Sequence, residues 1–203
     1  MNINNIKFDY NSPVIITYLL ICIGAWLLNV ITHNKSNKLL FESYRSSLFN
    51  PLTYIRLFTH CIGHSNWEHL VNNFLYILLI GPMIEEKYGM INLIIMFLIT
   101  SLVIALFNMI FSNYSILGAS GNVYMLIVLS SFSNIQDKKI PITVILICIF
   151  YVIGEVKNSI INKNSKTYHN GHLIGALCGL LFGIYFLSHT SLLQILLLKT
   201  FLY

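Results

Sequence analysis

The chain has 203 residues, of which 56% are hydrophobic and only 9% are charged, and its mean hydropathy is +0.73. Soluble globular domains carry about a quarter charged residues, so this composition excludes most soluble classes and indicates a protein that lives in the bilayer. The formal net charge of +5 is scattered, without a block of basic residues, so we expect membrane surfaces and no nucleic acid as its partner.

Six apolar runs predict an all-α, polytopic membrane domain over residues 14–188, preceded by an N-terminal tail, 1–13. The runs lie at 14–31, 67–84, 90–111, 118–133, 140–156 and 172–188. The first run is longer than the core of a signal peptide and has no small-residue cleavage site after it. We therefore expect it to remain as the first span.

The connection 32–66 is the longest and is expected to lie in the membrane interface. Its aromatic residues stand among charged ones, as interfaces favour, and they are Phe41, Tyr44, Phe49 and Tyr54. The apolar C-terminal tail, 189–203, is too short for a span and either extends the sixth helix or lies on the membrane surface. The lysines and arginines do not fix the orientation, because an inward N-terminus would place more of them outside than inside.

Polar residues within a membrane domain persist only where they have polar partners or serve a function, so they mark candidate sites. Three clusters of this kind each stand at the start of an even-numbered run, and they are 59–73, 118–121 and 169–175. The connections before even-numbered spans all lie on one side of the membrane. His64, Ser120 and His172 therefore enter the same leaflet, and a serine with histidines at one depth is the outline of a nucleophile site.

The fourth run places its serine below the membrane surface. A helix over 118–133 is only about 24 Å long, against a hydrocarbon core of about 30 Å. If its far end reaches the opposite interface, Ser120 must begin beneath the near one. Such a short helix is tolerated only inside a bundle, so we expect a sunken, wet pocket around Ser120.

The sixth run supplies a partner for this serine. Glycine recurs at every fourth position, at Gly171, Gly175, Gly179 and Gly183. This spacing lets a neighbouring helix approach closely. If that neighbour is the fourth run, His172 comes within hydrogen-bond distance of the Ser120 hydroxyl and can act as its general base. Glycine spacing of this kind, taken alone, more often serves only helix packing. Together with a histidine at one end and G-A-S-G on another run, it favours a catalytic interpretation.

A serine that attacks an amide also needs donors for the oxyanion that forms. The backbone N–H of Ser120, near a helix N-terminus, is one such donor, and the side chains of His64 and Asn73 are candidates. His69 and Asn73 are four residues apart and share a helix face. The alternative is that His69 and Asn73 only bridge helices. No acidic residue is placed to orient His172, so a dyad is expected.

Taken in order, these motifs resemble the rhomboid family of intramembrane serine proteases, and the resemblance covers residues 56–183. The first cluster is similar to the family pattern H-x-x-x-x-H-x-x-x-N, at His64, His69 and Asn73. G-A-S-G, with Gly118 and Gly121 around its serine, matches the nucleophile motif G-x-S-G.

Further residues extend the resemblance. His172, Gly175 and Gly179 match H-x-x-G-x-x-x-G. Tyr124 resembles the aromatic residue on which the catalytic imidazole packs, and Glu85 the acidic residue that ends the second helix. One departure is the pair before the second span, where the family often has Trp-Arg and this chain has isoleucine followed by Arg56.

The resemblance implies that Ser120 is the nucleophile and His172 the base, with His64, Asn73 and the Ser120 amide stabilising the oxyanion. It implies an inward N-terminus and a site open to the extracytoplasmic side of a bacterial plasma membrane. The fifth helix would gate the substrates, which would be single-span membrane proteins cut near the outer end of their span. No cofactor and no metal are implied.

The sequence gives less support to three alternative functions. A zinc protease lacks support because H-E-x-x-H is absent and His64 and His69, five residues apart, would point about 140° apart on a helix. A non-proteolytic relative that binds or chaperones membrane clients would typically lack the serine or the histidine. In a transporter, polar groups would line a path through the membrane. The polar groups of this chain gather at one end of the predicted bundle instead. Two residues have weaker claims: His169 as the base and Glu155 as a gate contact.

Overall fold

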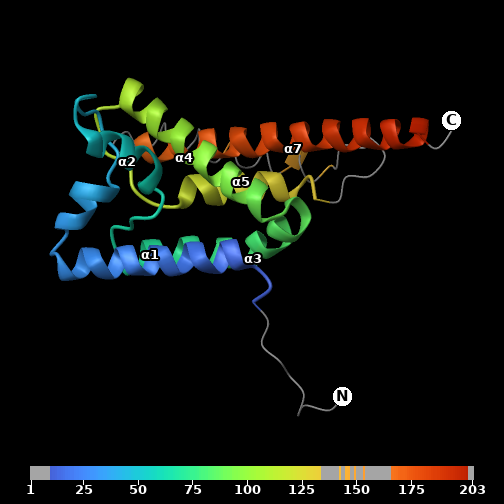
Figure 1. Ribbon diagram of the computed structural model, residues 1–203. Helices are drawn as coiled ribbons and strands as arrows, with labels where there is room; N and C mark the ends of the chain where they lie inside the picture. The colour runs from blue at the N-terminus through green and yellow to red at the C-terminus, as the bar shows by residue number, and fades with distance from the viewer. Residues whose placement is uncertain are drawn as a thin grey trace, which may run out of the picture.

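The computed structural model describes residues 10–133, 142, 145, 146, 149, 153 and 166–200, and within the last segment the side chains of 170–189. These residues form α-helices joined by short connections (Figure 1). In chain order the α-helices are α1 (Pro13–Ile31), α2 (Pro51–Thr59), α3 (Trp67–Tyr88), α4 (Met90–Phe111), α5 (Ser120–Ser130) and α7 (Lys166–Thr200). The expected fifth span, 140–156, lies mostly outside the described residues, as does most of the N-terminal tail.

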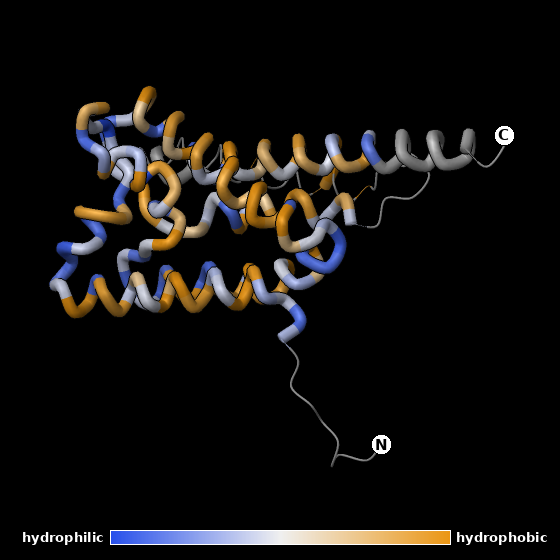
Figure 2. The backbone as a smooth tube through the Cα atoms, in the orientation of Figure 1, coloured by the Kyte–Doolittle hydropathy of each residue, from blue (hydrophilic) through white to orange (hydrophobic). Residues whose placement is uncertain are grey.

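Three helical stretches are long and apolar enough to cross a bilayer: α1, α4 and residues 170–189 of α7. Figure 2 shows their apolar character as long orange stretches of the tube, with blue segments at the connections. Helix α3 has 22 residues but carries charges near both ends. The all-α, polytopic membrane fold is therefore confirmed, whereas the count of six spans stays a prediction.

Helix α5 is the short helix that the sequence predicts. It has only 11 residues, most of them buried, and a helix of that size is about 16 Å long, roughly half the thickness of the hydrocarbon core. Helices α3, α4 and α7 pack around it. Its ends therefore lie inside protein, where polar backbone groups can find partners.

Helices α5 and α7 lie in backbone contact along the glycines of α7. A Cβ atom on Gly175 would overlap the carbonyl group of Gly121, and one on Gly179 would overlap the carbonyl group of Met125. Side chains larger than hydrogen at these positions would force the helices apart. The glycines of α7 thus face α5, which is the fourth apolar run. They set the distance between the two helices that carry the serine and the histidine.

Helix α1 begins at a cap supplied by α3. The backbone N–H groups of Val14 and Ile15 each donate to one carboxylate oxygen of Glu85, both at 3.0 Å. The first N–H groups of a helix have no partner within it, and a negative charge is favourable at that end. Glu85 is buried, so this acidic residue ties the start of α1 to the end of α3.

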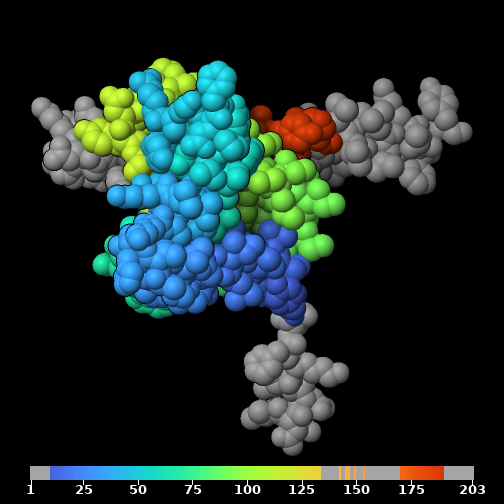
Figure 3. All heavy atoms as spheres, turned by 60° about the vertical axis from the view of Figure 1, so that its left-hand side comes forward, coloured from blue at the N-terminus to red at the C-terminus, as the bar shows by residue number. Residues whose placement is uncertain are grey.

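The connection 32–66 is folded, although the sequence predicts only an interfacial loop. It contains a π-helical turn, Asn37–Phe41, and helix α2. The side chain of Asn50 accepts a hydrogen bond from the N–H of Leu52 at 3.0 Å, and a proline at the first position favours the start of α2. In Figure 3 the light-blue and cyan atoms of this segment spread over the face that comes forward. Phe49 is 99% exposed there, as suits contact with a membrane interface.

Candidate active site

The serine and the histidine that the sequence singles out meet in the structure. His172 Nε2 lies 3.0 Å from Ser120 Oγ, which is hydrogen-bond distance. Ser120 is the first residue of α5, and His172 lies in the second turn of α7. Both side chains are half-buried. The close contact of α5 with α7 is what brings groups that are 52 residues apart in the chain together.

Tyr124 holds the plane of this imidazole. Its ring stacks on the His172 ring with the centroids 4.1 Å apart and the planes inclined by 13°. Tyr124 follows Ser120 by four residues, so both side chains project from the same face of α5. The stack therefore fixes the orientation of the ring whose Nε2 faces the serine.

His69 lies against the backbone just before Ser120. A Cβ atom on Gly118 would stand 2.5 Å from Cε1 and 2.7 Å from Nε2 of the His69 ring, and Gly118 also has a φ of +119°. Only glycine satisfies both conditions comfortably. Ser65 Oγ, 3.2 Å from His69 Nδ1, steadies the ring, and Asn66 caps α3 by accepting from the His69 N–H at 2.8 Å.

His64 is fully buried and both of its ring nitrogens are engaged. Nδ1 lies 3.0 Å from the carbonyl oxygen of Ile62, which can only accept, so Nδ1 carries the proton. Nε2 then accepts from the Asn73 amide, also at 3.0 Å. Burial, with a contribution from the charge of His69, lowers the pKa of His64 to about 4. His64 is therefore neutral near pH 7 and has no N–H left for an oxyanion. The arrangement makes it a partner of Asn73 and not a donor beside it.

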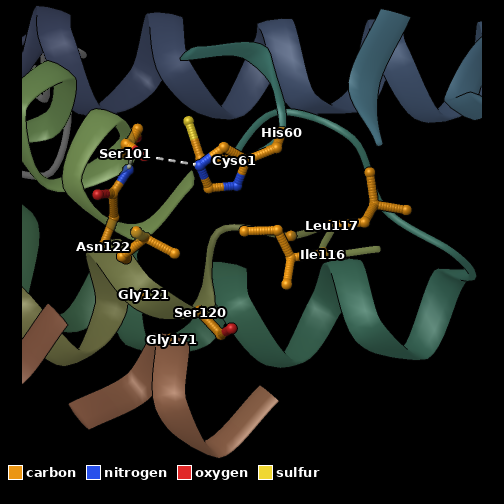
Figure 4. A pocket seen from close by; sticks show the side chains of 11 residues that line it. His60, Cys61, Ser101, Ile116, Leu117, Ser120, Gly121, Asn122 and Gly171 are labelled. Atoms are coloured by element: carbon orange, nitrogen blue, oxygen red, sulfur yellow. Dashed lines mark hydrogen bonds between the residues drawn. The ribbon is translucent and has the colours of Figure 1, made fainter. Parts of the chain in front are cut away.

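His60 is a residue of the site that the sequence reasoning missed. Its Nε2 lies 2.9 Å from the carbonyl oxygen of Ser101 in α4, and its own carbonyl accepts from the N–H of Gly118 at 2.8 Å. Figure 4 shows the His60 ring reaching toward Ser101. Burial lowers the pKa of His60 to about 4, so the ring is neutral. His60 thereby joins α4 to the backbone that leads into Ser120.

A cavity of about 20 Å³ lies next to Ser120 (Figure 4). Its polar walls include His60, Ser101 and Asn122, and the amide of Asn122 donates to Ser101 Oγ at 3.4 Å. A polar cavity of this volume is large enough for one water molecule. Ser120 thus borders a polar space inside the bundle.

Arg56 bonds to side chains of the segment that precedes α2. It is buried in α2, where one nitrogen donates to the Tyr44 hydroxyl at 2.6 Å and another to Ser46 Oγ at 3.4 Å. Its guanidinium also lies 4.4 Å from the centre of the Tyr44 ring. Arg56 therefore stabilises the fold of the connection 32–66.

Two weaker candidates remain untested. The side chain of His169 and all of Glu155 lie outside the described residues. Among the residues that are described, no three His, Cys, Asp or Glu side chains cluster so that they could hold a metal ion.

Comparison with known proteins shows which family the chain belongs to. A family model, the Rhomboid domain, matches residues 51–189. That range runs from the start of α2 into α7 and includes every candidate site residue named above. A search of curated proteins finds no match to the sequence. Because the family model covers most of the chain, this membrane protein belongs to the rhomboid family.

Proposed function

We propose that this rhomboid-family protein is an intramembrane serine endopeptidase in which Ser120 is the nucleophile and His172 the general base. The observation that carries the proposal is the 3.0 Å separation of His172 Nε2 and Ser120 Oγ inside the helix bundle. A serine–histidine pair inside a membrane bundle is costly unless it is used. A protein that only bound membrane clients would not need it.

The pair supports a two-step acyl transfer. Ser120 Oγ attacks the carbonyl carbon of the peptide bond while its proton passes to His172 Nε2. The tetrahedral intermediate then expels the amine, which takes that proton from His172, and leaves an acyl group on Ser120. A water molecule deprotonated by His172 attacks this ester and restores the serine. The polar cavity beside Ser120 is where such a water can lie.

The oxyanion needs donors on the other side of the attacked carbon. The N–H of Ser120 stands in the first turn of α5 and has no partner within that helix. The Asn73 amide carries a second hydrogen beyond the one given to His64. The ring of His69 lies over Gly118, two residues before Ser120. We assign the oxyanion to Asn73, His69 and the Ser120 amide, with His64 orienting Asn73.

The substrates that fit this site are single-span membrane proteins. A short, enclosed α5 starts at Ser120, so the peptide must come to the serine from within the bilayer. A carbonyl in an intact helix is hydrogen-bonded and covered, so the segment to be cut must first unwind. Unwinding is easiest near the end of a span. Cleavage therefore occurs near the extracytoplasmic end of the substrate's span, and residues 140–156 act as the gate.

The deciding experiment compares Ser120→Ala and His172→Ala with the wild type in membranes. The readouts are cleavage of a panel of single-span proteins and covalent labelling by a fluorophosphonate, which needs no known substrate. We expect both variants to lose both signals. Ser131→Ala, at the far end of α5, is the matched control and should keep them. A wild type that is folded and binds the panel but is neither labelled nor active would establish a binding role instead.

A further inference from the structure

A cavity of about 360 Å³ lies at the end of the bundle away from Ser120. It is lined by residues from α3, α4 and α7 and by the turn after α5, namely Lys87, Tyr88, Asn92, Phe132, Gly183, Phe186 and Leu187. Gly183 follows His172 by a helical rise of about 16 Å. In Figure 1 this is the region on the right where α3 ends and α4 begins, beside α7. The cavity therefore belongs to the opposite membrane face.

Lys87 places a fixed positive charge at this cavity. Its Nζ donates to the carbonyl oxygen of Phe132 at 2.8 Å and to that of Ser133. Both carbonyls follow the end of α5, where backbone oxygens lack partners within the helix. An ammonium has three hydrogens, so one remains, and both partners are neutral. The side chain is exposed. Its charge is thus held in position without being neutralised by either carbonyl.

The floor of the cavity is apolar. The ring of Tyr88 packs on the ring of Phe186, with the centroids 4.9 Å apart. A Cβ atom on Gly183 would overlap the Phe132 ring, so the floor is closed there by an aromatic face. At the rim, Asn92 donates to the carbonyl of Tyr88 at 2.7 Å and keeps a second amide hydrogen. The cavity thus has a cationic, hydrogen-bonding rim over an apolar interior.

We propose that this cavity binds an anionic glycerophospholipid, with the phosphate at Lys87 and Asn92 and an acyl chain against Phe186 and Leu187. Basic pockets between membrane helices are suited to anionic headgroups, because the phosphates of the leaflet lie at that level. Lysine binds phosphate as a point charge. A free phosphate ion would use the rim and leave the apolar floor without contact. A lipid satisfies both parts.

The test is native mass spectrometry of the full chain with equal amounts of phosphatidylglycerol and phosphatidylcholine. Carrying Ser120→Ala in all samples keeps the result independent of proteolysis. The wild-type cavity should retain phosphatidylglycerol about fivefold over phosphatidylcholine, which is what one lysine near an anionic surface provides. Lys87→Gln should abolish the preference and Lys87→Arg should keep it. Lys38→Gln, an exposed lysine in the connection 32–66, is the matched control.

A second variant and a second measurement also test the lipid site. Asn92→Asp sets a negative charge in the lining of the same cavity without touching the carbonyls after α5, so it should also remove the preference for phosphatidylglycerol. The temperature of thermal unfolding should rise when phosphatidylglycerol is added. It should not rise when inorganic phosphate is added at millimolar concentration. Equal retention of the two lipids, a preference that survives both Lys87→Gln and Asn92→Asp, or stabilisation by phosphate alone would overturn the lipid site.

Discussion

The ring of His172 stacks on the ring of Tyr124 with their planes inclined by only 13°. One helix therefore carries both Ser120 and the ring that orients His172, because Tyr124 and Ser120 are a single turn apart on α5. The geometry of the pair depends on a contact that contributes no atom to the reaction.

Tyr124→Ala should lower kcat/KM for a single-span substrate by about fivefold, because an aromatic contact of this kind is worth about 1 kcal/mol. The imidazole would then sample orientations in which Nε2 does not face Ser120. Tyr124→Phe keeps the stacked ring and should retain most of the activity. Equal losses in the two variants would show that the hydroxyl matters and the stack does not.

Gly175→Ala should abolish activity and lower the stability of the protein, because the new methyl group would overlap the carbonyl of Gly121. Overpacking of this kind costs about 1–3 kcal/mol, and here it also separates Ser120 from His172. Fluorophosphonate labelling and thermal unfolding in detergent measure the two effects. Gly24→Ala in α1 is the matched control: a Cβ atom there meets nothing within 4 Å, so its activity and stability should not fall.

His64 and Asn73 should behave as one unit in a double-mutant cycle. Asn73→Ala removes a proposed oxyanion donor and should lower kcat by about a hundredfold or more. If His64 acts only by orienting that amide, His64→Ala should cost less, and the double variant should be no worse than Asn73→Ala alone. If the activity losses of the two single variants multiply in the double variant, His64 has a role of its own that does not depend on Asn73.

Acid should destabilise the folded protein between pH 6.5 and pH 4. Burial lowers the pKa of His60 and of His64 to about 4, whereas the same residues in an unfolded chain titrate near pH 6.5. The unfolded state then binds more protons in this window, so stability is complete above pH 6.5 and falls as pH decreases toward 4. Each histidine contributes up to about 3 kcal/mol.

Thermal unfolding across that pH range measures the effect, and a variant shows its source. His60→Gln removes one of the two titrating rings, so its stability should change less with pH than that of the wild type. A pH dependence as steep as in the wild type would place the titrating groups elsewhere in the chain.

Glu85→Gln should lower thermal stability by about 1–2 kcal/mol, because the first N–H groups of α1 would lose a charged cap. The residue is far along α3 from His69, so activity per folded molecule should be unchanged. Glu86→Gln removes an exposed charge at the neighbouring position and should alter neither quantity. An unfolding temperature that is the same in both variants would contradict the capping role.

The sequence predicted the membrane class and the meeting of Ser120 with His172, because apolar runs and glycine spacing are local patterns. It named His64, and not His69, as a donor for the oxyanion. These residues stand in one polar cluster, and His64 precedes the start of α3, so helical phase says nothing about its direction. Only the tertiary fold puts His69 over Gly118 and His64 behind Asn73.

His60 and helix α2 were missed for a related reason. The bonds that give His60 its position go to backbone groups of Ser101 and Gly118, which any residue type can supply, so no sequence pattern marks them. Helix α2 has only 9 residues, too few to show a clear helical period in the sequence, and its clearest signal is the pair Asn50 and Pro51 at its start. That pair is also common in turns, so it did not distinguish a helix from a loop.

The backbone contact of α5 with α7 also limits how the bundle can move. With glycine on one side and carbonyl groups on the other, no side chain lies between the two helices to absorb sliding or tilting at these points. They should travel as one rigid body whenever the protein admits a peptide. Any opening toward the lipid must then come from other segments, while the distance between nucleophile and base stays the same before and after the substrate arrives.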